Sequence, residues 1–265
     1  MSESCQGSPP PIPLPIVDLW LLDTETVAPA DLAHLSTCLE PAEQHKLQTL
    51  TRPQARQQFI LSRGCLRVLL SHYTGKSPAS LRFAYGPQGK PALDFADEDG
   101  IAPRFNLSHS GQRILIGTSR ADGVGAIGVD IEAVRSVRYL PELCHRYFTP
   151  AEAQSILALS GHEADCHFLR HWTGKEACLK ALGIGIAESL QKLELAPPLD
   201  LGLDLTQIAL AAPDLPQHPK QLYQWQPEPG YLAAVAVQAP VPMREYFRLH
   251  QTTPQALVTG AAFAS

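Results

Sequence analysis

The apolar positions of this chain fall into short continuous runs and into stretches at helical spacing. Residues 16–22 form an apolar run of strand length, and residues 113–118 and 126–131 form two more on either side of a turn at 121–123. From residue 53 to residue 73 the apolar positions recur at helical spacing, and Gly75 provides a stop. The pattern therefore predicts three strands and one long helix.

Further along the chain, helix and strand signals are mixed. Thr149, Pro150 and Glu152 form a capping box with proline at the first helical position, which predicts a helix start. A second helix is expected over residues 165–182, ending at Gly183, and later strands near 191–195, 222–226 and 231–238. Residues 1–14 indicate an irregular lead-in, and 96–100 an acidic loop. Without a strict βαβ alternation, this order favours an α+β fold.

Composition narrows the class of protein. Residues are 45% hydrophobic and 18% charged, as in an ordinary globular protein, and the net charge of -5 argues against broad nucleic-acid binding. No stretch reaches the length of a membrane span, and the proline-rich start does not resemble a secretory signal. The six cysteines are scattered, which predicts free thiols in a reducing, cytoplasmic setting.

The run at 126–132 carries the first candidate chemistry. Alternate residues of a strand share a face, so Asp130 and Glu132 should lie together, opposite an apolar core face. Two carboxylates about 7 Å apart along a strand can converge on one hard cation, and Gly128 on the same face would leave room for a ligand. The alternative is the solvated face of an amphipathic strand.

A second candidate lies in the helix expected over 165–182. Trp172, Glu176 and Lys180 stand four residues apart and therefore share one helical face. A Glu–Lys pair at this spacing is commonly a surface ion pair, but a tryptophan on the same stripe indicates a partly buried face. Such a pair is a candidate for proton handling or metal binding.

Two further features are compatible with an anionic ligand. The segment around Ser108 and His109 is a short strand ending in small polar residues, where hydroxyl and backbone donors can meet an anion, or else a plain turn. No nucleophile elbow is present, which excludes a serine hydrolase. Four cations form the other feature, each of which alone could be a solvated surface charge: Lys46, Arg56, Arg63 and Lys90.

The motifs occur in an order that resembles the Sfp-type 4'-phosphopantetheinyl transferases. The order is Gly-Lys-Pro (89–91), Asn-Leu-Ser-His-Ser (106–110), Gly-Val-Asp-Ile-Glu (128–132), Phe-Thr-Pro-Ala-Glu (148–152) and Trp-Thr-Gly-Lys-Glu-Ala-Cys-Leu-Lys-Ala (172–181). The similarity spans most of the chain, from about Lys46 to Tyr231. One departure is Gln58, which stands where many members of the family carry a basic residue.

The resemblance implies a fold and an organisation. It implies an α+β pseudo-dimer of two similar halves with the active site between them, over residues 15–120 and 121–240, followed by a tail at 241–265. The net charge and the lack of a membrane-length apolar stretch predict no binding to nucleic acid or membranes, while the internal pseudo-dimer of the family favours a monomer. Its partners would be coenzyme A and apo acyl or peptidyl carrier proteins of fatty-acid, polyketide or nonribosomal-peptide synthesis.

The same resemblance implies a reaction and its residues. Asp130, Glu132 and Glu176 would bind Mg²⁺, and the 4'-phosphopantetheine of coenzyme A would pass to a carrier serine, releasing adenosine 3',5'-bisphosphate. Glu176 and Lys180 would be catalytic. The coenzyme contacts implied are Lys46, Arg63, Lys90, Ser108, His109 and Lys180.

Some questions stay open on the sequence alone. A non-catalytic coenzyme A-binding module and a magnesium-dependent pyrophosphohydrolase are the alternatives to the transferase. Arg113, Arg135 and Arg138 are candidates to meet an acidic helix of the carrier, although exposed arginines are usually just solvated.

Overall fold

We describe the protein from a computed structural model. The structure describes residues 16–94, 102–121, 123–185, 190–197, 200–215 and 218–264. The expected lead-in at 1–14 and acidic loop at 96–100 lie outside the described residues, as does part of the turn at 121–123.

The first half of the chain builds a sheet with one long helix packed on it. Its elements are β1 (Val17–Asp23), α1 (Pro29–Thr37), α2 (Pro41–Thr49), α3 (Pro53–Thr74), η1 (Pro78–Ser80), β2 (Phe83–Tyr85), β3 (Pro91–Leu93), β4 (Arg104–Ser110) and β5 (Arg113–Ser119). The sheet order is β11-β1-β5-β4, and β2 and β3 form a separate hairpin. Gly75 ends α3 in the left-handed conformation, as its glycine predicts.

The second half repeats the plan. Its elements are β6 (Ala126–Ala133), α4 (Leu140–Tyr147), α5 (Pro150–Leu157), α6 (Gly161–Leu182), η2 (Leu190–Lys192), β7 (Glu194–Ala196), β8 (Thr206–Ala211), β9 (Gln221–Trp225) and β10 (Tyr231–Gln238). The sheet order is β6-β10-β9-β8-β7. The capping box at the start of α5 is present, with both of its hydrogen bonds.

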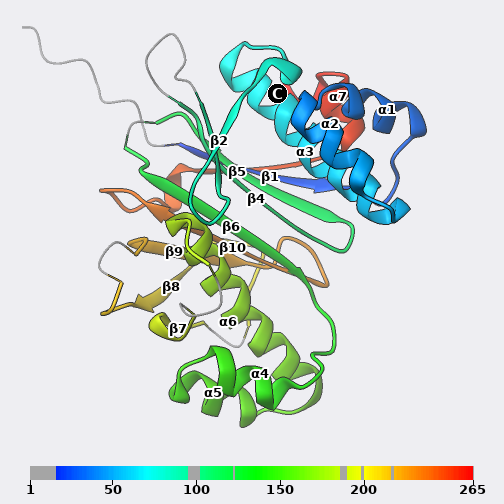
Figure 1. Ribbon diagram of the computed structural model, residues 1–265. Coiled ribbons are helices and arrows are strands. Elements are labelled where there is room, and N and C mark those ends of the chain that lie inside the picture. Colours follow the sequence, from blue (N-terminus) through cyan, green and yellow to red (C-terminus); the bar gives the residue numbers. More distant parts are fainter. Residues whose placement is uncertain are drawn as a thin grey trace, which may run out of the picture.

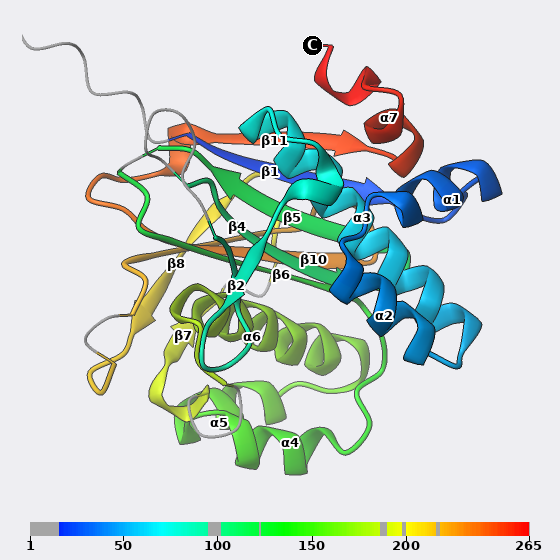
Figure 2. The ribbon, with the colours of Figure 1, turned by 45° about the horizontal axis from the view of Figure 1, so that its top comes forward.

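The two halves are similar in topology. Each begins with a strand, continues to a helix of 22 residues (α3 and α6), and ends with a strand that pairs antiparallel with the first one. The α+β pseudo-dimer expected from the sequence is therefore confirmed. Figures 1 and 2 show the sheets in the middle of the molecule, with α1–α3 on one side and α4–α6 on the other.

Side-chain alternation along the strands creates three layers of core. On β1, Leu19 and Leu21 face the second sheet and pack with Val129 and Val235. Trp20 and Leu22, on the opposite face of β1, pack against α3. On the outer face of the second sheet, α6 packs on the residues of β9 and β10. The strands are thus buried on both faces, which explains their continuous apolar runs.

The chain returns to its first half after β10. The segments concerned are η3 (Arg244–Tyr246), β11 (Phe247–Thr252), α7 (Pro254–Val258) and η4 (Ala261–Phe263). Strand β11 pairs parallel with β1, and Leu257 of α7 belongs to the core beneath α3. In the sequence analysis, residues 241–265 carried no expected element.

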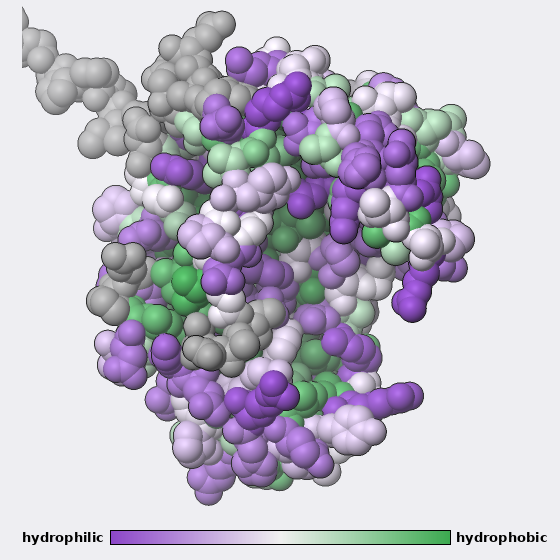
Figure 3. Space-filling view, in the orientation of Figure 1, coloured by the Kyte–Doolittle hydropathy of each residue, from purple (hydrophilic) through white to green (hydrophobic). Residues whose placement is uncertain are grey.

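The described part of the molecule has a mainly hydrophilic face (Figure 3) and free thiols. In the described part of the chain, the helices are too short or too polar to cross a membrane. Figure 3 shows that the face viewed there is mainly hydrophilic, with smaller hydrophobic areas between. The cysteines Cys38, Cys65, Cys144, Cys166 and Cys178 are free, and only Cys166 is not buried. The free thiols match the sequence prediction for these five.

Candidate active site

Strands β4 and β6 meet where the two halves of the molecule join, and polar side chains connect them. Asn106 accepts a hydrogen bond from the backbone N–H of Val129 at 2.8 Å. The Ser110 hydroxyl accepts one from the backbone of Ala133 at 3.0 Å and donates one to Glu132 at 2.9 Å. The face of β4 that carries these residues is therefore fixed against the acidic face of β6.

Asp130 and Glu176 meet at this join on either side of Lys180, and Glu132 follows Asp130 two residues later on β6; we call Asp130, Glu132 and Glu176 the acidic cluster. The Lys180 ammonium lies 2.6 Å from Asp130 Oδ1 and 3.4 Å from Glu176 Oε2. It also donates to Ser108 Oγ at 3.0 Å, and that hydroxyl donates to Asp130 at 2.7 Å. Residues from β4, β6 and α6 thus meet in one network, as expected for a site between the halves.

Burial distinguishes this site from a solvated strand face. Asp130 is only 3% exposed, and Ile127, Val129 and Ile131 on the other face of β6 lie in the core. The alternation predicted for β6 is confirmed. The alternative of a solvated acidic face is wrong for Asp130, because α6 covers that side of the strand.

Gly128 has a different role from the one the sequence suggested. A Cβ at this position would lie 2.0 Å from the carbonyl oxygen of Ala177 and 2.3 Å from the backbone nitrogen of Ala181. The space beside Gly128 is filled by the backbone of α6, so the expectation of room for a ligand there is wrong. Close helix packing instead brings Glu176 and Lys180 to Asp130.

Burial and mutual charge shift the pKa values in the cluster. Burial raises the pKa of Asp130 to about 7, although the Lys180 cation opposes this shift and Glu176 adds to it. Burial also raises the pKa of Glu176, again against the attraction of Lys180. For Lys180 burial alone would lower the pKa, but Asp130 and Glu176 raise it overall, which keeps the ammonium charged.

The carboxylates of the acidic cluster are candidate ligands for a metal ion. Among the described residues, no three His, Cys, Asp or Glu side chains are arranged as a ready-made metal site. Lys180 lies between Asp130 and Glu176 and supplies the positive charge. The second oxygen of Asp130, Oδ2, is buried and has no hydrogen-bond partner within the described ranges. A buried carboxylate oxygen without a partner is chemically suited to a hard divalent cation.

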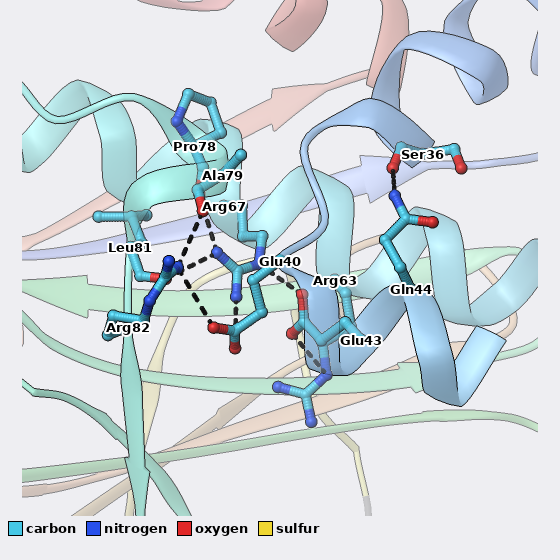
Figure 4. A network of polar contacts seen from close by, with 10 residues as sticks. All are labelled: Ser36, Glu40, Glu43, Gln44, Arg63, Arg67, Pro78, Ala79, Leu81 and Arg82. Atoms are coloured by element: carbon cyan, nitrogen blue, oxygen red, sulfur yellow. Dashed lines mark hydrogen bonds and ion pairs between the residues drawn. The ribbon is translucent and has the colours of Figure 1, made fainter.

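Two of the residues expected to bind the coenzyme line one cavity. Arg63 of α3 and His109 of β4 both border a cavity of about 560 Å³ between α3 and β4, and Gln58 lies on its wall. Burial lowers the pKa of His109, an effect that Lys180 reinforces and Glu132 opposes. Arg63 lies 3.9 Å from Glu43, at the edge of the ion-pair network in Figure 4. We call this space the α3–β4 cavity.

The other two expected cations lie elsewhere. The Lys90 ammonium donates to the backbone carbonyls of Ala181 at 2.8 Å and Ile127 at 3.1 Å, and burial lowers its pKa to about 8. Lys46 is exposed on α2. The structure therefore brings Ser108 and Lys180 into the acidic cluster and places Arg63 and His109 in the α3–β4 cavity. Lys90 spans the join between the halves, and Lys46 lies apart on the surface.

The arginines considered for carrier recognition differ in their surroundings. Arg113 is mostly buried and pairs with Asp23 at 2.8 Å and Glu228 at 2.7 Å. Arg135 is exposed and lies 2.7 Å from Glu132. Arg135 and Arg138 border a second cavity, of about 440 Å³, together with Glu132 and Trp172. Arg135 and Arg138 are therefore exposed beside the acidic cluster, although Arg135 already pairs with Glu132, whereas Arg113 is mostly buried between its two carboxylate partners.

The sequence analysis missed the roles of Asn106 and Ser110. Both belong to the Asn-Leu-Ser-His-Ser segment, and both hold β4 against β6. The spacing of these polar residues could have revealed their role. Asn106, Ser108 and Ser110 alternate along a strand just as Gly128, Asp130 and Glu132 do, so each segment presents one polar face.

Comparison with known proteins identifies the chain's relatives. A model of the 4'-phosphopantetheinyl transferase superfamily matches residues 126–236. The chain is 35% identical to the 4'-phosphopantetheinyl transferase HetI of Nostoc sp. over 68% of this chain and 73% of that protein. It is 25% identical to the 4'-phosphopantetheinyl transferase Sfp of Bacillus subtilis, over 76% of this chain and 83% of the relative. The matched segment contains all three residues of the acidic cluster and Lys180.

Proposed function

This chain belongs to the 4'-phosphopantetheinyl transferases, and from that premise we propose that it moves the 4'-phosphopantetheine of coenzyme A to a serine of an apo carrier protein. The observation that carries the proposal is the contact of Lys180 with Ser108, Asp130 and Glu176 at the join of the two halves. A cation held among carboxylates and a hydroxyl is suited to a pyrophosphate substrate.

The reaction is a displacement at phosphorus. The carrier serine oxygen forms a bond to the phosphorus that bears pantetheine, and the bond from that phosphorus to the bridging oxygen of the pyrophosphate breaks. Adenosine 3',5'-bisphosphate leaves. Glu176 accepts the serine proton, and the raised pKa of this buried carboxylate makes it a stronger base than an ordinary glutamate. The Lys180 ammonium stabilises the negative charge on the departing phosphate.

Asp130, Glu132 and Glu176 would hold Mg²⁺ in the active enzyme. When bound, the ion would neutralise pyrophosphate charge. The Oδ2 atom of Asp130 supports this assignment. Lys180 contacts the other carboxylate oxygen, Oδ1, and Oδ2 itself is buried with no hydrogen-bond partner among the described residues. Serine hydroxyls hold the other side of the cluster: Ser108 bonds Asp130 and Ser110 bonds Glu132, which fixes two carboxylates in orientation.

The α3–β4 cavity is the proposed place of the nucleotide end of coenzyme A. Arg63 and His109 border it, and apolar side chains, including Phe59 and Leu66, form much of its wall. An apolar wall with a few cationic or hydrogen-bonding groups is suited to a base and its phosphate. Lys90 and Lys46 would contribute at its margin only if their side chains left their present positions.

The acceptor would be an acyl or peptidyl carrier domain of fatty-acid, polyketide or nonribosomal-peptide synthesis. The surface beside Glu132 offers Arg135 and Arg138 around an apolar cavity that includes Trp172. Such a surface combines positive charge with apolar contact, as an acidic amphipathic helix requires. We infer a monomer acting in the cytoplasm, because the pseudo-dimer supplies both sides of the site within one chain and the five described cysteines are free thiols.

The test is transfer to a carrier followed by intact mass spectrometry. The purified protein, coenzyme A, Mg²⁺ and an apo carrier should give a carrier heavier by one phosphopantetheine. Glu176→Gln and removal of metal with a chelator should each abolish this gain. Glu142→Gln, an exposed glutamate of α4, is the matched control and should retain it.

The same reactions distinguish the alternatives. A pyrophosphohydrolase would release free phosphopantetheine when no carrier is present. A coenzyme A-binding module would bind the coenzyme and modify none of several apo carriers. Either result would contradict the transferase proposal.

A further inference from the structure

A third cavity, of about 460 Å³, lies beside the N-terminal part of α6. Its wall includes His162, Glu163, Cys166 and Arg170 from that helix. Arg170 precedes Glu176 by six residues, about 9 Å along the helix axis, and no residue of the acidic cluster is on the wall. We call this space the α6 N-terminal cavity. The transfer reaction as proposed makes no use of it.

Arg170 is an unusual residue to find on such a wall. Arg170 is only 8% exposed to solvent, and its Nε has no hydrogen-bond partner in the described part of the chain. Burial lowers its pKa, while Cys166 and Asp200 act in the opposite direction through their charge. An arginine stays protonated in proteins, so this site holds a cation with at least one N–H donor, that of Nε, not used in hydrogen bonding within the described part of the chain. A buried donor without an acceptor is unfavourable, and more so when the group is charged.

The remaining wall indicates what kind of molecule could satisfy Arg170. Val134, Leu159 and Leu232 contribute apolar surface. The volume lies within the range of pockets for small organic ligands, roughly 300–1,000 Å³, and far exceeds the roughly 30 Å³ that one water occupies. The planar guanidinium matches the two oxygens of a carboxylate or the oxygens of a phosphate. Asp200 and Glu163 also border the cavity, so a dianion would be repelled more than a monoanion.

We propose that the α6 N-terminal cavity binds a small organic anion, a carboxylate or a phosphate monoester with an apolar body, through the guanidinium of Arg170. The apolar body would lie against Val134, Leu159 and Leu232. Val134 and Leu232 adjoin Glu132, since Leu232 is its partner on β10 and Val134 follows two residues later on the chain. An occupant of this cavity would therefore contact the backbone that positions one member of the acidic cluster.

Cys166 makes the proposal measurable. Its thiol borders the cavity, lies 3.4 Å from His162 Nε2, and is the one described cysteine that is not buried. Alkylation by N-ethylmaleimide, followed by digestion and mass spectrometry, reports Cys166 separately from every other cysteine. The probes are acetate, benzoate and inorganic phosphate, each compared with sodium chloride at equal ionic strength. Carboxylate and phosphate probes together decide which anion the site prefers.

The expected result is at least a threefold slowing of Cys166 alkylation by benzoate or phosphate in the wild-type protein. Arg170→Gln should abolish the protection, and Arg170→Lys should weaken it, because lysine keeps the charge but loses the planar fork. Arg170→Gln removes a buried donor whose Nε has no hydrogen-bond partner among the described residues, so the variant should fold. In the control variant Arg248→Gln, which changes an exposed residue of β11, the anions should protect Cys166 to the same extent as in the wild type.

Two results would overturn the proposal. One is an alkylation rate that none of the three anions changes beyond the chloride control. The other is equal protection in Arg170→Gln and the wild type, which would show that the anions act elsewhere. The readout does not depend on coenzyme A or a carrier, so it is independent of whether the transferase proposal holds.

Discussion

Lys180 illustrates how a single side chain holds this site together. Its ammonium contacts Asp130, Glu176 and Ser108, which come from three different elements. Like charges at Asp130 and Glu176 would otherwise repel in a buried setting, and this repulsion raises the pKa of Asp130 further after burial has done so. Lys180 is therefore both a structural counter-ion and the group best placed to meet a pyrophosphate.

We expect Lys180→Met to lower the transfer rate by at least about 100-fold, equivalent to about 2.7 kcal/mol in the barrier. The variant keeps the apolar stem but removes the charge that, in the proposed reaction, stabilises the departing phosphate. The measurement is single-turnover transfer at saturating coenzyme A and carrier. Lys192→Met, at an exposed lysine in η2, is the matched control and should keep the wild-type rate. A Lys180→Met rate within threefold of wild type would exclude a role in the chemical step.

Arg67 forms a second buried ion network, which shares no residue with the acidic cluster. It is fully buried, lies 2.5 Å from Glu43 and 2.8 Å from Glu40, and donates to the carbonyls of Pro78 and Leu81 (Figure 4). Arg67 lies on the same helix, α3, as Arg56 and Arg63. Its charge is used inside the protein, where it ties α2 and the segment after α3 to α3.

Arg67→Met should destabilise the protein by about 3–5 kcal/mol, because two largely buried carboxylates lose their cation. Urea denaturation followed by circular dichroism measures this as a lower midpoint. Arg52→Met, at an exposed arginine before α3, should change the free energy of unfolding by less than about 0.5 kcal/mol. If Arg67→Met unfolds at the wild-type midpoint, the network does not contribute to stability.

Among the elements, the contact of α6 with β6 decides the geometry of the site. Gly128 lets the helix backbone approach the strand so closely that no larger residue fits between them. The carboxylates of β6 and the Glu–Lys pair of α6 meet because of this contact. A small shift of α6 would therefore separate Asp130 from Lys180.

Gly128→Ala tests this contact. The added methyl would lie 2.0 Å from a carbonyl oxygen, so α6 has to move, and overpacking of this kind typically costs about 1–3 kcal/mol. We expect lower stability and, in the protein that remains folded, a transfer rate reduced at least tenfold. Gly202→Ala is the control, since its nearest neighbour would be 3.9 Å away. Equal activity and stability in both variants would show that Gly128 is not needed for close packing.

Elements with a strong local pattern were predictable, and those set by distant partners were not. The periodicity of α3, the capping box of α5 and the alternation on β6 all agree with the structure. Strand β11 and helix α7 were not expected, because β11 is stabilised by parallel pairing with β1, more than 200 positions earlier. Helix α2 is polar along most of its length, so its sequence carries little periodicity.

For the candidate site, residue types were predictable but neighbours were less so. Alternation and helical spacing correctly put Asp130 with Glu132 on one face of a strand and Glu176 with Lys180 on one face of a helix. No sequence rule specified that Lys180 would contact Asp130, or that Lys90 would bind the carbonyl at the end of α6. Those contacts depend on how the two halves pack.

At the scale of the whole molecule, polar bridges join the halves around the shared core. Lys90, in the first half, bonds Ile127 and Ala181 in the second. Arg113 of β5 reaches Glu228, and its guanidinium lies over the ring of Tyr231. A site that spans this join depends on both halves being folded. Its activity should therefore be lost with global unfolding, whichever half unfolds first.

The pH dependence of that global stability should come largely from two buried histidines of α6. Burial lowers the pKa of both His167 and His171 to about 4. The positive charge of Arg170 lowers both pKa values further. His171 has the same effect on His167, and Lys175 on His171. In the unfolded chain a histidine titrates near 6.5. Between about pH 6.5 and 4 these two histidines therefore bind more protons in the unfolded state than in the folded state. Asp130 acts in the opposite direction, because its pKa of about 7 lies above the value of about 3.9 in an unfolded chain, but one carboxylate offsets only one of the two histidines.

The two histidines therefore make the folded protein less stable as the pH falls. The stabilisation is complete above about pH 6.5 and is lost as the pH falls toward 4, by up to about 1.4 kcal/mol per pH unit for each histidine. Urea midpoints measured from pH 7.5 to 4.5 should fall steeply in the wild type and less steeply in the variant carrying His167→Gln and His171→Gln. His34→Gln, at an exposed position of α1, should follow the wild-type curve. Parallel curves for the wild type and the double variant would assign the acid sensitivity to the carboxylates instead, because buried neutral histidines would then contribute nothing to the proton balance of unfolding.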